Sequence, residues 1–343
     1  MANQAEVSPR KRKAVEDELE MEASSVAAMT TMNMNQPAAE ESEPILSNPS
    51  DGAGTSGSAE IWPGEYEWSC CFRDDEIMQQ QSAIREEAAK VPYVGDKDPL
   101  SALEAEFESG DPILKEKIRL LGEQYAALRR TRGDGNCFFR SFMFAYLEHI
   151  LVTKDADEVE RITRKVIQCR LTLQSLGYTE FTYEDFFNIF MEQLESVMTS
   201  MSIEELLSRS RDQCISDYVV MFFRFVTSGE IRKRAEFFEP FIAGLTNTSV
   251  DQFCKSSVEP MGEECDHVHI IAMTDALGVS IRVVYLDRSS CDKGELAVNH
   301  HDFIPTAASS VGSSSSSSAS GNITEPFITL LYRPGHYDIL YRR

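Results

Sequence analysis

The stretch Thr131–Arg140, which reads TRGDGNCFFR, is the part of the chain that best predicts its fold and chemistry. Gly133 and Gly135 allow the backbone to turn sharply and to expose its amides. The next residues, Phe138–Leu151, are mostly apolar and numerous enough for a buried helix. Cys137 therefore falls in the first turn of that helix.

The first turn of a helix is a favourable position for a reactive thiol. Unpaired amides and the positive end of the helix dipole favour thiolate over thiol, and the thiolate is the nucleophile. The amides of Cys137 and of the loop Asp134–Asn136 can also point at one small volume, as the oxyanion of a tetrahedral acyl intermediate requires. On this stretch alone an alternative stays open, that Cys137 is an inert core residue, because cysteine is among the most buried residue types.

The C-terminal end of the chain supplies the groups that a nucleophilic cysteine needs. Phe327–Tyr332 has the pattern of a strand, Arg333–Gly335 that of a turn, and His336–Tyr341 that of a returning strand. His336 and Asp338 are two residues apart, so they share one face of that strand. The carboxylate can then hold the imidazole in the tautomer of a general base. A cysteine with a distant histidine and an acidic partner predicts a thiol hydrolase.

These two motifs together resemble the otubains, which are ovarian-tumour-type (OTU) cysteine proteases that remove ubiquitin. The resemblance rests on Asp134–Cys137 with Arg333–Tyr341 and extends over most of the chain from about Asp74 onward. Further stretches that carry it are Phe181–Phe186, Ser216–Tyr218, Thr227–Gly229 and Val258–Met261. A run of serines inserted between the last strands departs from the family pattern. Because it lies in a connection, it affects loop geometry and not the catalytic residues.

The resemblance implies the fold and the roles of the site residues. The fold would be α+β, a papain-like OTU cysteine protease fold with a small mixed sheet packed against the nucleophile helix and an inserted helical lobe. Carried over by position, Cys137 would be the nucleophile, His336 the general base, Asp338 the residue that orients it, and Asp134 the residue that shapes the oxyanion loop. Neither the residues nor the resemblance requires a cofactor or a metal.

The resemblance also implies a substrate. The expected reaction is hydrolysis of the isopeptide bond between the C-terminus of ubiquitin and a lysine, through a thioester on Cys137, with polyubiquitin of the lysine-48 type as the expected chain. The competing hypothesis is a binding protein that represses ubiquitin-charged conjugating enzymes without using its thiol. The expected partners are accordingly ubiquitin, polyubiquitin and, in the second hypothesis, ubiquitin-conjugating enzymes.

Composition limits the partners and the compartment. The formal net charge of −23 over 343 residues would repel a phosphate backbone, so nucleic acid is not an expected partner. No run of 18 apolar residues exists, and the nearest candidate, Ile215–Val226, is interrupted by Asp217 and Arg224, so no membrane association is expected. The N-terminus opens no apolar signal segment. We therefore expect a cytoplasmic and nuclear protein whose 8 cysteines are free.

The chain before the catalytic domain divides into a tail and an arm. Residues 1–65 have the composition of a disordered acidic tail, in which the basic cluster Pro9–Lys13 is compatible with a nuclear localisation signal. Residues 66–98 are predicted to form an amphipathic arm and a linker. Its helix, Asp74–Lys90, has a thin apolar stripe of Ile77, Ile84 and Ala88, which suits either simple packing or docking of a partner.

The OTU catalytic domain is expected over residues 99–343, with a helical lobe at about 158–260 and a Ser-rich surface loop at 306–321. Periodicity predicts a helix over Ile113–Leu128 before the cysteine loop, and β-branched residues predict a strand over Val279–Leu286. The adjacent His300 and His301 are expected in a connection.

A run of acidic, cysteine and histidine residues, Glu263–His269, has the composition of a metal site, but its expected geometry does not support one. Asp266 is a natural N-cap for a helix over His267–Leu277. Residues two apart on a helix diverge by about 200°, so His267 and His269 cannot face one ion.

Overall fold

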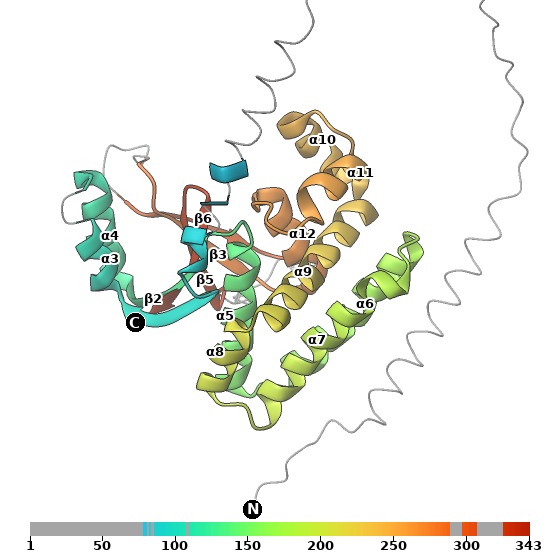
Figure 1. Cartoon of the computed structure of the whole chain (residues 1–343), viewed down its shortest axis with the longest axis horizontal. Coiled ribbons are helices and arrows are strands. Elements are labelled where there is room, and N and C mark those ends of the chain that lie inside the picture. The colour runs from blue at the N-terminus through green and yellow to red at the C-terminus, as the bar shows by residue number, and fades with distance from the viewer. Residues whose placement is uncertain (1–77, 81, 84–85, 108–109, 289–296, 307–324) are drawn as a thin grey trace, which may run out of the picture. The chain divides into compact units, whose positions relative to one another are not determined.

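The computed structural model describes residues 78–80, 82–83, 86–107, 110–288, 297–306 and 325–343 (Figure 1). The predicted tail with its basic cluster, the residues Ile77 and Ile84 of the arm, and nearly all of the Ser-rich loop lie outside these ranges. Within the arm, residues 78–80, 82–83 and 86–89 are helical. The chain divides into the units Met1–Ile84 and Arg85–Arg343, and the second contains the sheet and the helices from α3 onward.

The centre of the second unit is a mixed sheet, which has six strands in the described part of the chain. Their order is β1-β2-β6-β5-β3-β4. Only β3 and β5 are parallel, and every other neighbouring pair is antiparallel. The strands are β1 (Val94–Pro99), β2 (Tyr125–Thr131), β3 (Ile281–Tyr285), β4 (Asn299–Phe303), β5 (Ile328–Arg333) and β6 (His336–Arg342). The predicted C-terminal hairpin is therefore formed by β5 and β6.

Helices cover the sheet on both faces, which explains why its inner strands are apolar at consecutive positions. On one face the cross-strand pair Leu330 and Ile339 belongs to the main core, together with α5 (Cys137–Thr153). On the other face Leu331 and Leu340 pack with residues of α3 (Leu100–Glu106) and α4 (Pro112–Gln124). Successive side chains of a strand point to opposite faces of the sheet. Leu330 and Ile339 therefore pack against one layer of helices, and Leu331 and Leu340 pack against the other.

The remaining helices lie beyond α5, away from α3 and α4 (Figure 1). They are α6 (Ala156–Ser175), α7 (Glu180–Thr199), α8 (Ile203–Arg211), α9 (Gln213–Lys233), α10 (Ala235–Thr246), α11 (Val250–Phe253), the π-helix η1 (Cys254–Val258) and α12 (His267–Leu277). As predicted, α12 spans His267–Leu277 and is capped by Asp266, whose carboxylate accepts the amides of Val268 and His269. No helix in the described ranges is long and apolar enough to cross a membrane.

An aromatic cluster joins the nucleophile helix to the helical lobe. Phe222 of α9 stacks on Phe190 of α7 at 4.3 Å between ring centroids. The neighbouring Phe223 meets Phe142 of α5 edge to face at 5.2 Å. Aromatic pairs in these geometries add to the stabilisation from buried apolar area. The cluster therefore holds α9 firmly against α5, and α9 carries charged groups toward the start of α5.

Three sequence predictions about local structure were wrong, each because tertiary pairing overrode the local pattern. The helix predicted over Ile113–Leu128 ends at Gln124, since the next residues pair as β2 with β1 and β6. The end of the region 66–98, predicted as an arm and a linker, contains most of β1. His300 and His301 lie in β4 and not in a loop. Strands β1 and β4 are the two edges of the sheet, where polar residues are common.

Candidate active site

Cys137 is the first residue of α5 and is 4% exposed. The preceding residue, Asn136, is the N-cap, but its side chain does not cap the helix. Unpaired amides at a helix start attract negative charge. The structure therefore places this thiol at the positive end of a buried helix, as predicted.

The loop before Cys137, Arg132–Asn136, is called the cysteine loop and offers two amides to a bound anion. The amide of Asp134 donates to the Arg132 carbonyl at 3.0 Å, and the amide of Asn136 donates to the Asp134 Oδ1 atom at 3.0 Å. In the described part of the chain, no acceptor takes the amides of Gly135 and Cys137. The sequence suggested that all the loop amides converge, whereas only these two are available to hold an oxyanion.

Gly135 lets the loop pack tightly against a second loop. Its φ of +75° lies in the region that favours glycine, and a Cβ atom there would overlap the backbone of Gly262. Gly133 is different, because a Cβ atom at that position would meet nothing closer than the Nδ1 atom of His336, at 3.6 Å. The packing of the loop therefore requires glycine at position 135 but not at position 133.

His336 and Asp338 lie together on β6, as their spacing predicted. The Nε2 atom of His336 is 3.0 Å from the Oδ1 atom of Asp338. The carboxylate of Asp338 is fully buried, and it also accepts the Thr131 amide at 3.0 Å and a charged hydrogen bond from Arg333. Three donors on one carboxylate hold it in a single orientation. The imidazole is consequently fixed with its other nitrogen, Nδ1, facing the cysteine loop.

The surroundings of His336 favour its protonated form. Burial alone would lower its pKa, but the hydrogen bonds to Asp338 and Cys137 and the negative charge of both groups outweigh burial and raise the pKa to about 9. Burial also acts to raise the pKa of Asp338. The hydrogen bond from His336 and the charge of Arg333 oppose that effect, so the pKa of this carboxyl lies below its ordinary value. The pair is therefore an imidazolium beside a carboxylate at neutral pH.

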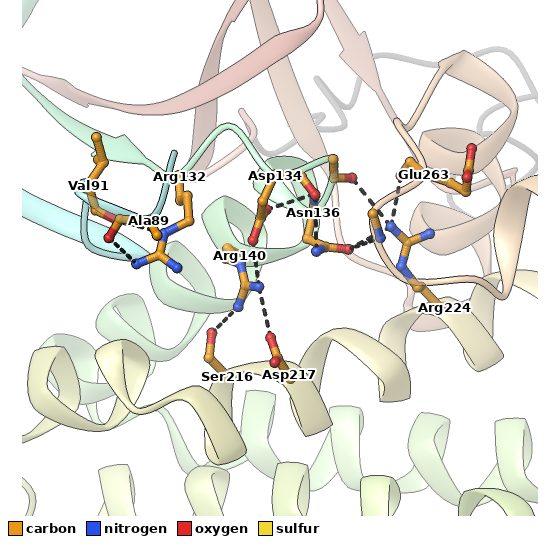
Figure 2. Close-up of polar contacts among 12 residues, drawn as sticks. Ala89, Val91, Arg132, Asp134, Asn136, Arg140, Ser216, Asp217, Arg224 and Glu263 are labelled. Atoms are coloured by element: carbon orange, nitrogen blue, oxygen red, sulfur yellow. Dashed lines mark hydrogen bonds and ion pairs between the residues drawn. The ribbon is translucent and has the colours of Figure 1, made fainter. Parts of the chain in front are cut away.

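Asp134 shapes the loop from within and is held by a buried arginine (Figure 2). Its Oδ2 atom accepts from the Nη2 atom of Arg140 at 2.9 Å, while its Oδ1 atom takes the Asn136 amide. Arg140, only 1% exposed, also pairs with Asp217 at 2.9 Å and donates to Ser216. Arg140 thus links Asp134 to α5 and α9, and the role of Asp134 in shaping the oxyanion loop stays a prediction.

The sequence pointed to the groups that are proposed to react but not to the groups that hold them. Arg140 and Arg224 are both fully buried and both contact the cysteine loop. Thr131, whose amide binds Asp338, was also missed. The available signal was an arginine within an apolar helix, because a buried charge must be paired. Within the described ranges, no group of three or more His, Cys, Asp or Glu side chains is placed to hold a metal ion.

Comparison with known proteins identifies the family. The family model of Peptidase C65 Otubain matches residues 86–342, which is well over half of the chain. The chain therefore belongs to the otubain family, and the predicted family membership is confirmed.

Individual relatives agree with this assignment. The OVARIAN TUMOR DOMAIN-containing deubiquitinating enzyme 1 of Arabidopsis thaliana is 62% identical over 295 residues, which cover 85% of this chain and 93% of that protein. The ubiquitin thioesterase OTUB1 of Homo sapiens is 41% identical over 275 residues, covering 80% and 92%. A solved h/ceOTUB1 complex with ubiquitin aldehyde and UBCH5B~Ub is similar with a TM-score of 0.67 and 32% identity, over 80% of this chain and 100% of that one. The predicted α+β, papain-like OTU fold is confirmed.

The contrast between the two loop glycines can be tested by protein stability. Gly135→Ala should lower the free energy of unfolding by about 2 kcal/mol or more, because it adds left-handed strain and displaces the Gly262 backbone. The control, Gly133→Ala, should change it by less than about 1 kcal/mol. Urea unfolding of both variants measures this, and equal losses would show that the two loops are not packed as described.

Proposed function

We propose that this protein is a cysteine-type deubiquitinase, a ubiquitin thioesterase and isopeptidase in which Cys137 is the nucleophile. The observation that carries the proposal is one arrangement of three features. A thiol lies at a helix start, two amides without a described acceptor lie beside it, and an imidazole fixed by a buried carboxylate faces the cysteine loop. This combination supplies nucleophile, oxyanion donors and proton carrier for acyl transfer.

The reaction follows from these groups. The thiolate of Cys137 attacks the carbonyl carbon at the C-terminus of ubiquitin, and the amides of Gly135 and Cys137 receive the negative oxygen. The imidazolium of His336 gives its proton to the departing lysine amine, the C–N bond breaks, and a thioester remains. The neutral imidazole then takes a proton from water, which attacks the thioester and releases ubiquitin and the thiolate. Asp338 keeps the imidazole oriented throughout, and Asp134 holds the loop.

Ubiquitin as the substrate is supported by the relatives, and one surface of the chain has the character of a protein-binding surface. The similar proteins are named deubiquitinating enzyme and ubiquitin thioesterase, and similar solved structures contain ubiquitin aldehyde. On α10, the side chains of Phe237, Phe241 and Leu245 recur every four residues and are 44%, 54% and 64% exposed. Exposed apolar stripes of this kind mark surfaces that bind another protein.

The proposal can be tested with diubiquitin of every linkage type. The wild-type protein should hydrolyse these substrates and act fastest on the lysine-48 linkage, whereas Cys137→Ala should show no hydrolysis. A ubiquitin probe with a C-terminal electrophile should label Cys137 and not the exposed Cys214. Activity that survives in Cys137→Ala would contradict the assignment of the nucleophile. Equal rates on all linkages would remove the lysine-48 preference and leave the chemistry intact.

The dependence on pH should report His336. Because its pKa is about 9, the imidazolium that protonates the leaving amine is present below that pH and is lost as the pH rises through it. The value of kcat/KM should therefore fall above about pH 9. Asp338→Asn removes the negative charge that raises this pKa, so its decline should begin at a lower pH. An unchanged alkaline limb in that variant would show that another group controls it.

A second function is favoured by the solved complexes that resemble this chain. They contain UBC13~Ub or UBCH5B~Ub in addition to ubiquitin aldehyde. We propose that this protein also binds ubiquitin-charged conjugating enzymes and represses them without using its thiol. Cys137→Ala should then still slow polyubiquitin synthesis by a charged conjugating enzyme. If the variant has no effect at concentrations well above that of the enzyme, hydrolysis is the sole function supported.

A further inference from the structure

We propose that Arg224 is a positioning residue for catalysis, which fixes the peptide groups of the cysteine loop so that the Gly135 amide faces the oxyanion beside the Cys137 amide. The inference rests on the thiol hydrolysis proposed above. Arg224 belongs to α9, in the helical lobe, and its side chain is fully buried. Figure 2 shows it reaching toward the loop from the side opposite Arg140.

One guanidinium group binds three separate segments of the chain. Its Nη2 atom donates to the Asn136 Oδ1 atom at 2.7 Å, to the Glu263 carbonyl at 2.7 Å and to the Gly135 carbonyl at 3.3 Å. Its Nη1 atom donates to the Val258 carbonyl at 2.9 Å. The planar group can therefore hold the cysteine loop at a fixed distance from the segment that leads into α12.

The contact with Asn136 determines where the amide of Gly135 points. The Asn136 Oδ1 atom accepts from Arg224 and from the Gly262 amide, which leaves its Nδ2 group to donate to the Asp134 carbonyl at 3.3 Å. The carbonyl and the amide hydrogen of a trans peptide point in opposite directions. Because the Asp134 carbonyl is turned toward Asn136, the amide of Gly135 in the same peptide is turned away from it and stays unpaired.

The direct contact with the Gly135 carbonyl fixes the next peptide in the same way. Its amide belongs to Asn136 and is directed to the Asp134 carboxylate. That amide is thereby kept away from the oxyanion, and the Cys137 amide that follows is free of any described acceptor. Arg224 thus acts on the Gly135 donor through the loop backbone and never touches the reacting atoms, while the peptide that carries the Cys137 amide is held by the bond from the Arg140 amide to the Asn136 carbonyl at 3.0 Å.

The experiment separates acyl transfer from simple thiol reactivity. Hydrolysis of ubiquitin carrying a C-terminal fluorescent leaving group forms an oxyanion. Alkylation of Cys137 by iodoacetamide does not, since a C–S bond forms as iodide leaves. Arg224→Gln should lower kcat by about 10²-fold, as loss of one oxyanion donor does, with a much smaller change in KM. The alkylation rate, read on the Cys137 peptide by mass spectrometry, should stay within about threefold of wild type.

A second buried arginine provides the matched control. Arg129 of β2 is 4% exposed and donates to the Gly95 carbonyl at 2.8 Å and to the Tyr341 hydroxyl at 3.0 Å, and it has no bond to the cysteine loop. Arg129→Gln should lower Tm to a degree similar to Arg224→Gln and leave kcat unchanged. If both variants lose Tm and neither loses kcat, Arg224 has only a structural role and the inference is overturned.

A further variant covers the case in which Arg224→Gln fails to fold. Asn136→Ala removes the side chain through which Arg224 orients the Gly135 amide and keeps the bonds of Arg224 to Gly135, Val258 and Glu263. It should reproduce the loss of kcat with alkylation preserved, and full activity in this variant would contradict the inference. An inactive wild-type protein would instead refute the proposed hydrolysis, so the two failures are distinguishable.

Discussion

The geometry of the site depends on one buried carboxylate. Asp338 is inaccessible to solvent, and it accepts hydrogen bonds from the Thr131 amide, from His336 and from Arg333. An unpaired buried charge costs several kcal/mol, so the strands that supply these donors are restricted to one arrangement. Thr131 is the last residue of β2 and stands immediately before the cysteine loop. The Asp338 carboxylate therefore sets both the orientation of the imidazole and the point at which the loop begins. It does so although Asp338 and Thr131 are 207 positions apart.

The same constraint operates on the helical side of the loop, with the signs of charge reversed. Arg140 and Arg224 are buried guanidiniums whose donors need acceptors, and the loop supplies three of the acceptors: the Asp134 carboxylate, the Asn136 amide oxygen and the Gly135 carbonyl. Removing one partner of a buried pair commonly costs about 3–5 kcal/mol. The sheet thus fixes the imidazole of His336, α5 and α9 fix the loop, and the thiol lies where these parts meet.

The sequence predicted those parts of the structure that depend on neighbouring residues. The helix that starts at Cys137, the strand pair around Gly335 and the cap of α12 at Asp266 follow from local composition and spacing. They include all the groups proposed to react. Strand β2 was missed because its first residues, Tyr125–Leu128, continue the apolar spacing of the predicted helix, and pairing with two other strands decides its conformation.

The supporting groups escaped prediction for a different reason. Arg224 interrupts an apolar helix, and from the sequence this interruption served only as an argument against a membrane span. Its partners lie 34 to 89 positions away, so no local pattern could reveal them. A buried arginine in an apolar helix is nevertheless informative, because desolvation lowers its pKa and only a concentrated set of acceptors keeps it charged. Such a residue indicates that backbone carbonyls must converge on its guanidinium. A loop that exposes its amides for catalysis turns its carbonyls the other way, and these carbonyls can serve as the acceptors.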